Sequence, residues 1–239
     1  MSGERVEITM EDGVADAYLV RPDAQPRGAV LLIMDAYGLR PQIEAMADRV
    51  AAEGYVVLAP NVFYREVRGE LLPPEEIAGG GAFAKVMPLV RGLTPDLIVR
   101  DGPAYLDALG QRPVAITGYC MGGRAGWHLA AAYPDRVAAL GGFHVGGLVT
   151  DGADSPHRKA ANVGAEIYFG HADNDRSMNP EQIAQLDKAM DDAGVAHRTE
   201  VYDGAAHGYT MADTPAYDEA AAERHYRELF ALLDRTVAA

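Results

Sequence analysis

The sequence predicts an α/β fold in which a mostly parallel central sheet carries helices on both faces. Two observations lead to this prediction. Short, continuously apolar segments alternate along the chain with longer amphipathic segments, as they do where buried parallel strands are joined by helices. The chain of 239 residues also shows no internal repeat and only a short proline- and glycine-rich stretch at 73–81. We therefore expect a single domain over residues 1–239.

The first half of the chain supplies the first strands and one clear helix. Three apolar segments are predicted strands: 14–20, 28–34 and 55–60. Pro41 stands at a favourable first helical position. Apolar residues recur from there at helical spacing, and Gly54 ends the helix. A loop-rich segment, 61–81, follows and is interpreted as an excursion within the domain.

The second half continues the alternation of strands and helices. The predicted strands are 113–117, 137–143, 165–169 and 198–202. The predicted helices are 95–109, 121–133, 181–193 and 217–237. Sheets of this kind bind ligands at the carboxyl ends of their strands, so we expect the chemistry on the loops that follow the strands.

Charge and cysteine content exclude several classes of protein. The chain has 35 Asp and Glu against 21 Lys and Arg, a net charge of −14. Such a surface, without a Lys/Arg cluster, indicates no nucleic-acid partner and no anionic membrane surface. Residues 1–12 lack the pattern of a secretory signal, and no apolar run is long enough to span a membrane. One cysteine allows no internal disulfide and no zinc site by itself. We expect a cytoplasmic protein without a cofactor, and the sequence gives no indication of its oligomeric state.

The single cysteine lies in the segment 118–123, Gly-Tyr-Cys-Met-Gly-Gly, between a predicted strand and a predicted helix. This is the context of the G-x-S-x-G nucleophile elbow, with Cys120 in place of serine. The nucleophile of an elbow has a strained backbone, and its neighbours two residues away must be small. The helix N-terminus favours a thiolate, and the N–H of Met121 faces the place where an oxyanion would form. The alternative interpretation is a tight turn around an inert, buried cysteine.

An acid and a histidine follow the cysteine in the chain order of α/β-hydrolases, which is nucleophile, acid, histidine. Strand 165–169 leads into a loop with Asp173 and Asp175, and strand 198–202 leads to His207. Taken singly, an acidic loop is usually a turn former and a loop histidine is usually solvated. Their joint position on successive strand-end loops predicts a Cys–His–Asp triad.

The residues alone leave other classes of protein and of site open. A reactive cysteine can be oxidised, so a redox-sensing protein is one alternative, although a second, resolving cysteine is absent. A non-catalytic, hydrolase-like binding protein is another. His171, Asp173 and Asp175 share a loop that His144 could join, which suggests a metal site. We expect no metal, because the acid that His207 needs is not free to bind one.

The sequence resembles the dienelactone hydrolase family of α/β-hydrolases over nearly its whole length, from about Glu7 to the C-terminal helix. The most specific matching segments are 118–123 and Ala-His-Gly-Tyr at 206–209, supported by 58–64 and 178–180. The resemblance implies an α/β-hydrolase fold and a hydrolase of the carboxymethylenebutenolidase type. Such an enzyme cleaves small-molecule carboxylic esters or lactones through a thioester acyl-enzyme.

The roles of the family's residues carry over to positions of this sequence. Cys120 matches the nucleophile and His207 the base. The acid falls on Asp175, which we favour over Asp173. The resemblance also implies two backbone N–H groups as oxyanion donors, those of Ala36 and Met121.

The sequence departs from the family's best-known members around the thiol. Those members carry a glutamate that contacts the resting thiol, and here the position is Asp35, one methylene shorter and our candidate for thiol gating. They also bind a substrate carboxylate with two arginines, at positions that are Met211 and the segment 79–83 in this chain. Four other arginines could replace them: Arg40, Arg65, Arg68 and Arg124. Three aromatic residues flank the predicted loops and are candidates for the substrate pocket: Tyr37, Tyr64 and Phe83.

Overall fold

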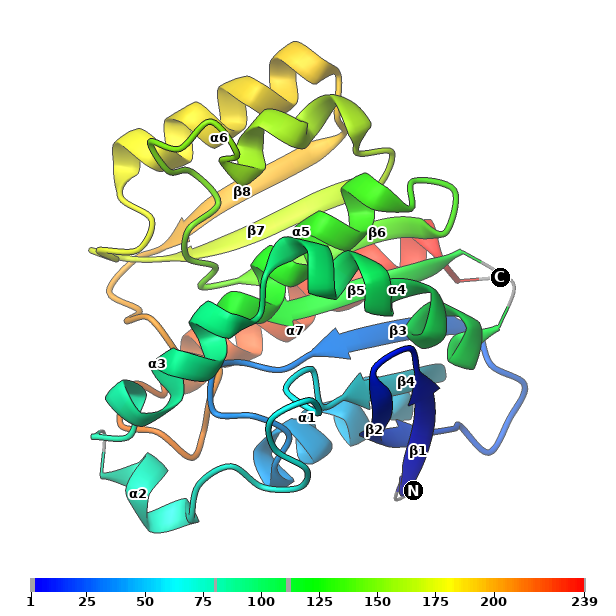
Figure 1. The fold of residues 1–239 in the computed structure, drawn as a ribbon. Helices are drawn as coiled ribbons and strands as arrows, with labels where there is room; N and C mark the ends of the chain where they lie inside the picture. Colours follow the sequence, from blue (N-terminus) through cyan, green and yellow to red (C-terminus); the bar gives the residue numbers. More distant parts are fainter. Residues whose placement is uncertain (1–2, 80, 111–112, 239) are drawn as a thin grey trace.

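Eight strands form one sheet in the computed structural model, which describes residues 3–79, 81–110 and 113–238 (Figure 1). The strand order is β1-β2-β4-β3-β5-β6-β7-β8. β1 and β2 form an antiparallel hairpin, β2 runs antiparallel to β4, and the remaining pairs are parallel. The carboxyl ends of the parallel strands therefore meet at one edge.

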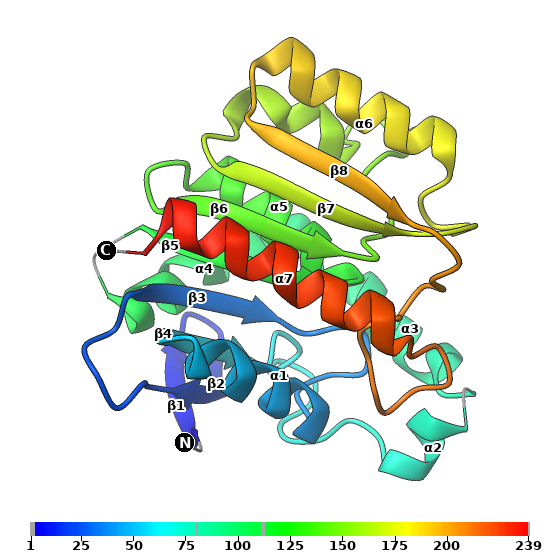
Figure 2. The same cartoon turned by 180° about the vertical axis from the view of Figure 1, so that it is seen from behind.

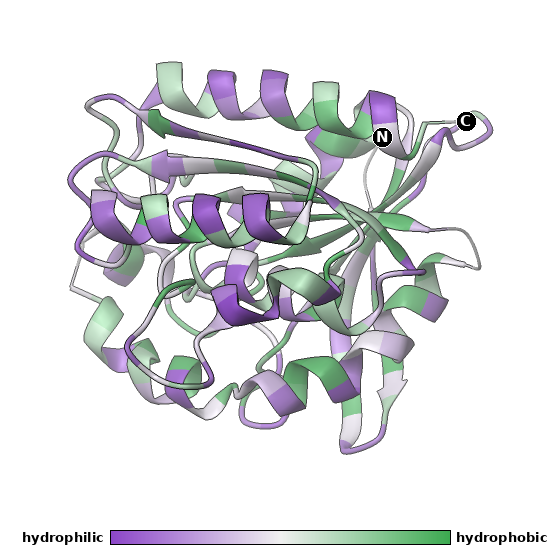
Figure 3. Ribbon diagram, turned by 90° about the horizontal axis from the view of Figure 1, so that it is seen from above, coloured by the Kyte–Doolittle hydropathy of each residue, from purple (hydrophilic) through white to green (hydrophobic). Residues whose placement is uncertain are grey.

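The strands are apolar because most of them are covered on both faces. All six residues of β4 and of β5 are buried. The bounds are β1 Glu4–Met10, β2 Gly13–Val20, β3 Gly28–Ile33, β4 Tyr55–Pro60, β5 Val114–Tyr119, β6 Val137–Phe143, β7 Glu166–Ala172 and β8 His197–Tyr202. The hydropathy colouring shows green along the central strands, whereas the helices alternate between green and purple (Figure 3).

Helices cover both faces of the sheet (Figures 1 and 2). α4 and α5 pack on one face, where η1 contacts both α5 and α6, and α1 and α7 pack on the other. The bounds are α1 Pro41–Ala52, α2 Pro74–Ala78, α3 Phe83–Gly92, α4 Pro95–Leu109, α5 Met121–Ala132, the 3-10 helix η1 Pro156–Asn162, α6 Pro180–Ala193 and α7 Glu219–Thr236. α3 lies beyond the carboxyl ends of the central strands (Figure 1).

The predicted fold class is confirmed, and the predicted strands and helices are found within a few residues of the expected bounds. The structure adds four elements that we did not predict: β1, α2, α3 and η1. α2 falls inside the segment that we interpreted as loop-rich, 61–81, of which Gly80 lies outside the described residues. Within the described ranges, no helix combines the length and the apolar character needed to cross a bilayer.

Candidate active site

The turn between β5 and α5 holds Cys120 in a backbone conformation that only a tightly packed site sustains. Its φ is 54° and its ψ is −118°, a region that a residue with a side chain rarely adopts. The neighbouring glycines make this possible. A Cβ added to Gly118 would lie 2.5 Å from the carbonyl carbon of Gly122, and one added to Gly122 would lie 2.3 Å from the carbonyl oxygen of Ile33. The thiol is therefore presented at the edge where the parallel strands end.

His207 and Asp175 are brought together from two loops. His207 follows β8 and Asp175 follows β7, and the Nδ1–H of His207 donates to Oδ2 of Asp175 at 2.6 Å. The second carboxylate oxygen accepts from the backbone N–H of Ser177 at 2.8 Å and from its hydroxyl at 2.7 Å. Both oxygens of Asp175 are thus used, which fixes the carboxylate and the imidazole ring with it.

His207 and Asp175 each stabilise the charged form of the other. Burial alone opposes the charge on His207, but the hydrogen bond with Asp175 and the neighbouring Cys120 raise its pKa to about 10. Burial also opposes the charge on Asp175, yet His207 and Ser177 hold the pKa of this carboxyl below its ordinary value. At neutral pH the imidazole is consequently protonated, and it carries its positive charge beside the side chain of Cys120.

Two backbone N–H groups lie beside the thiol without a partner. Ala36 and Met121 line the same cavity as Cys120, and neither N–H has a hydrogen-bond acceptor in the described part of the chain. Met121 is the first residue of α5, so its N–H belongs to the unpaired set at a helix start. Such donors can hold an oxyanion.

Asp35 lies in the cavity next to Cys120 but is bonded to Arg40. The guanidinium of Arg40 donates to Oδ1 of Asp35 at 2.6 Å and to Oδ2 at 3.2 Å, and its Nε donates to Asp213 at 2.6 Å. Arg40 and Asp35 are both almost fully buried. Both carboxylate oxygens of Asp35 therefore serve the guanidinium, and one also accepts from the N–H of Tyr37 at 3.0 Å.

Two cavities open onto the thiol. The first, of about 250 Å³, is lined by Asp35, Tyr37, Phe83, His144 and Met211, together with Cys120 and His207. The second, of about 500 Å³, lies on the α5 side and is lined by Met87, Val90, Arg124 and Gln182, together with Cys120 and His207. Phe83 borders both cavities and is half exposed. The thiol thus lies where a substrate can extend in two directions.

The remaining residues that the sequence singled out do not belong to the group of Cys120, His207 and Asp175. Tyr64 is buried and donates to Asp101 at 3.0 Å, and neither cavity at the thiol is lined by it. Asp173 accepts from the N–H of Gly204 at 3.0 Å and so holds the turn before His207. His144 stacks edge-on against His207 with the ring centres 5.1 Å apart. No cluster of three or more His, Cys, Asp or Glu suited to a metal ion occurs within 3–79, 81–110 and 113–238.

Two features of the site were missed in the sequence. Ser177 bonds Asp175 and lies 3.4 Å from Nδ1 of His207, and the signal for it is the Asp-x-Ser spacing, which favours a local turn. α3 contributes Met87 and Val90 to the second cavity, but Pro88 within the helix obscures its pattern.

The charge state of His207 can be measured directly. Because the hydrogen bond with Asp175 and the neighbouring Cys120 raise the pKa of His207 to about 10, we expect the NMR signals of its ring to remain those of an imidazolium between about pH 7 and about pH 9. The chain unfolded in urea is the control, since its histidines should titrate near the ordinary value of about 6.5. Equal titration curves of His207 in the folded and the unfolded chain would contradict the raised pKa.

The fold and the site together define a hydrolase of the α/β-hydrolase class. A family model described as "Dienelactone hydrolase family" matches residues 15–237. The chain belongs to the dienelactone hydrolase family.

Known relatives extend over most of the chain. A putative carboxymethylenebutenolidase of Salmonella typhi is 27% identical over 226 residues, which cover 89% of this chain and 80% of the relative. A carboxymethylenebutenolidase homolog of Mus musculus is 26% identical over 218 residues, covering 85% and 82%. The crystal structure of a putative dienelactone hydrolase from Klebsiella pneumoniae has a TM-score of 0.83 at 21% identity and covers 98% of both chains. This last likeness supports the α/β-hydrolase fold.

Proposed function

We propose that this protein hydrolyses carboxylic esters or lactones through a triad of Cys120, His207 and Asp175. The observation that carries the proposal is the 2.6 Å hydrogen bond between His207 and Asp175 beside a thiol held on a strained elbow. The names of the relatives, putative carboxymethylenebutenolidase, agree with a substrate of this class. A lactone is an internal ester, so one mechanism serves both.

In the first half of the reaction, the thiolate of Cys120 attacks the carbonyl carbon. The N–H groups of Ala36 and Met121 hold the oxyanion, an interaction worth about 3 kcal/mol for each donor in a well-studied protease. The carbon–oxygen bond of the leaving group then breaks, and protonated His207 gives its proton to the alkoxide. The product of this half is an alcohol and a thioester on Cys120.

In the second half, neutral His207 removes a proton from water, and the resulting hydroxide attacks the thioester. Asp175 stabilises the imidazolium that forms. The carbon–sulfur bond breaks, the acid leaves, and the thiolate and imidazolium are restored. An amide is a poor substrate for this site, because the thiolate leaves the tetrahedral intermediate more readily than an amine does.

Capture of the acyl-enzyme tests the proposal. We expect acid quenching during turnover of an activated aryl ester to give a chain heavier by one acyl group, with the label on the peptide that contains Cys120. Hydroxylamine should remove the label, as it does for thioesters. A chain whose Cys120 has been alkylated beforehand is the control and should neither turn over the ester nor carry the label. Full activity of the alkylated chain would overturn the proposal.

A further inference from the structure

One buried histidine next to His207 has no part in the proposed reaction. His144 is the first residue after β6 and is only 1% exposed. Its φ is 41°, in the left-handed region that favours glycine and that other residues adopt at an energetic cost. Such a backbone persists only where the contacts around it compensate for the strain. The contacts of its side chain therefore indicate what a histidine contributes at this position.

His144 joins the ends of two central strands to the loop that carries His207. Its backbone N–H donates to the carbonyl oxygen of Gly170 in β7 at 2.8 Å. Its Nε2 forms a hydrogen bond of 2.8 Å with the hydroxyl of Thr210. Thr210 is buried and stands three residues after His207, on the loop between β8 and α7. The hydrogen bond thus fixes this loop to the carboxyl end of the sheet.

The ring of His144 also packs directly against the ring of His207. The two ring centres lie 5.1 Å apart, and the ring planes are inclined by 65°. Two further rings border His144: that of Tyr209 at 5.1 Å and that of Tyr119 at 6.1 Å. Both tyrosines are fully buried, so His144 has little room to move. The imidazole of His207 consequently rests against a neighbour that is itself held in place.

His144 is held in its neutral form. Burial lowers the pKa of His144 well below the ordinary value, and the positive charges of His207 and His225 lower it further, against the opposing effect of Asp175. A neutral ring adds no positive charge beside the imidazolium of His207. His144 can therefore support His207 without weakening the hydrogen bond that joins His207 to Asp175.

We propose that His144 is a positioning residue for catalysis, which keeps the imidazole of His207 in one orientation. It does so through its hydrogen bond to Thr210 and through its contact with the His207 ring. The inference rests on the proposed hydrolysis, in which His207 first gives a proton to the alkoxide and then takes one from water. Both steps need the same orientation of the ring, and a displacement of about 1 Å can lower a rate about a hundredfold.

Thr210→Val tests the hydrogen bond without altering the cavities, because Thr210 lines neither cavity at the thiol and valine has the shape of threonine. We expect kcat for an activated aryl ester to fall by between about tenfold and about a hundredfold. KM should change by less than about threefold, because His207 serves both halves of the reaction and the two rates fall together. Thr210→Ser keeps the hydroxyl and should retain most of the wild-type kcat.

His144→Phe breaks the same hydrogen bond from its other end and keeps an aromatic ring beside His207. We expect a similar fall in kcat, and the double variant should lose little more than either single variant, because the two side chains form one bond. NMR titration of His207 supplies a second measurement. In both single variants its pKa should fall from about 10 toward the ordinary value of about 6.5, because the bond with Asp175 is loosened.

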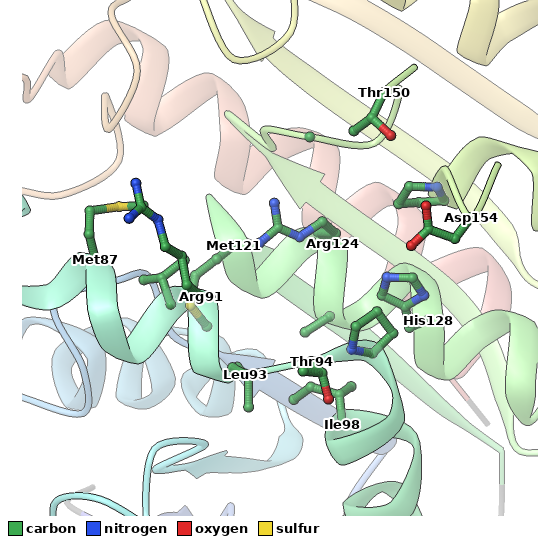
Figure 4. A pocket seen from close by; sticks show the side chains of 15 residues that line it. Met87, Arg91, Leu93, Thr94, Ile98, Met121, Arg124, His128, Thr150 and Asp154 are labelled. Atoms are coloured by element: carbon green, nitrogen blue, oxygen red, sulfur yellow. The ribbon is translucent and has the colours of Figure 1, made fainter. Parts of the chain in front are cut away.

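His128→Phe is the matched control. His128 of α5 is also a buried histidine, and burial lowers its pKa to about 4. It faces a separate cavity of about 410 Å³ (Figure 4), which neither Cys120 nor His207 lines. We expect kcat within about threefold of the wild type and an unchanged titration of His207.

Three results would overturn the inference and leave the proposed function standing. One is an unchanged kcat in Thr210→Val, which decides the question even where His144→Phe fails to fold. Another is a fall in kcat without a change in the pKa of His207, since a purely structural role would have that effect. The third is an equal loss in His128→Phe. A wild-type chain that cleaves no ester would instead refute the proposed function.

Discussion

Replacing Cys120 with alanine is expected to lower kcat for an activated aryl ester by a factor of between about ten thousand and about one million. The substitution removes the proposed nucleophile but leaves the His207–Asp175 hydrogen bond and the N–H groups of Ala36 and Met121 in place. Residual hydrolysis would come from those donors and from substrate binding. The measurement is kcat from initial rates, together with thermal unfolding to show that the elbow still folds.

Cys120→Ser is the companion variant for this prediction. Serine keeps the size of the side chain and a nucleophilic oxygen, but His207 must then remove a proton from a much weaker acid than a thiol. We expect its activity to lie between that of alanine and that of cysteine. Activity of Cys120→Ala within tenfold of the wild type would exclude the thiol as nucleophile.

The second large effect is expected at Asp175. Asp175→Asn should lower kcat by about ten-thousand-fold, as loss of the triad carboxylate does in a serine protease. The amide cannot stabilise the imidazolium, and its NH₂ group can favour the wrong tautomer of His207. The expected result is a fall in kcat at all pH values near neutrality, with little change in thermal stability.

Asp173→Asn supplies the matched control, because it is the same substitution two residues away on the same loop. Asp173 accepts a hydrogen bond from the N–H of Gly204 at 3.0 Å, and asparagine retains an acceptor oxygen for it. We expect kcat within about threefold of the wild type. If Asp173→Asn proves the more damaging change, the acid has been assigned to the wrong carboxylate.

The sequence indicated the elbow well because its requirements are local. Gly118 and Gly122 are close to Cys120 in the chain, and the steric reason for both is the sharp turn and its contact with β3. The choice between Asp173 and Asp175 was harder, since both stand on one loop and only the position of His207, more than 30 residues later, separates them. The structure brings Asp175 to His207, and its role in catalysis stays a prediction.

Two of the missed elements, the strand β1 and the helix α3, show different limits of sequence-based prediction. β1 carries an alternating pattern at Val6, Ile8 and Met10, but the polar residues between them, Glu7 and Thr9, concealed an edge strand. α3 contains Pro88, and its side chains are mostly exposed rather than packed in a core. An amphipathic pattern is weak where a helix covers a cavity instead of the sheet.

The sequence could not show which of the four candidate arginines form ion pairs with carboxylates of the chain. The ion pairs join parts of the chain that are distant in sequence. Arg65 meets Asp101, 36 residues away, and Arg40 meets Asp213, 173 residues away. Only the folded arrangement shows that three of the four candidate arginines, Arg40, Arg65 and Arg68, are paired with carboxylates.

The bond between Arg40 and Asp213 also bears on when the enzyme becomes active during its synthesis. Arg40 and Asp35 follow β3, and the elbow is complete once α5 has formed, whereas Asp213 lies near the end of the chain. During translation the first half of the sheet and the thiol emerge well before the segment that carries His207 and Asp213. A ribosome-bound fragment that ends before His207 therefore carries Cys120 without the histidine that we propose as its base, and one side of its cavity is missing. Under the proposed mechanism, we expect hydrolysis only after almost the whole chain has been made.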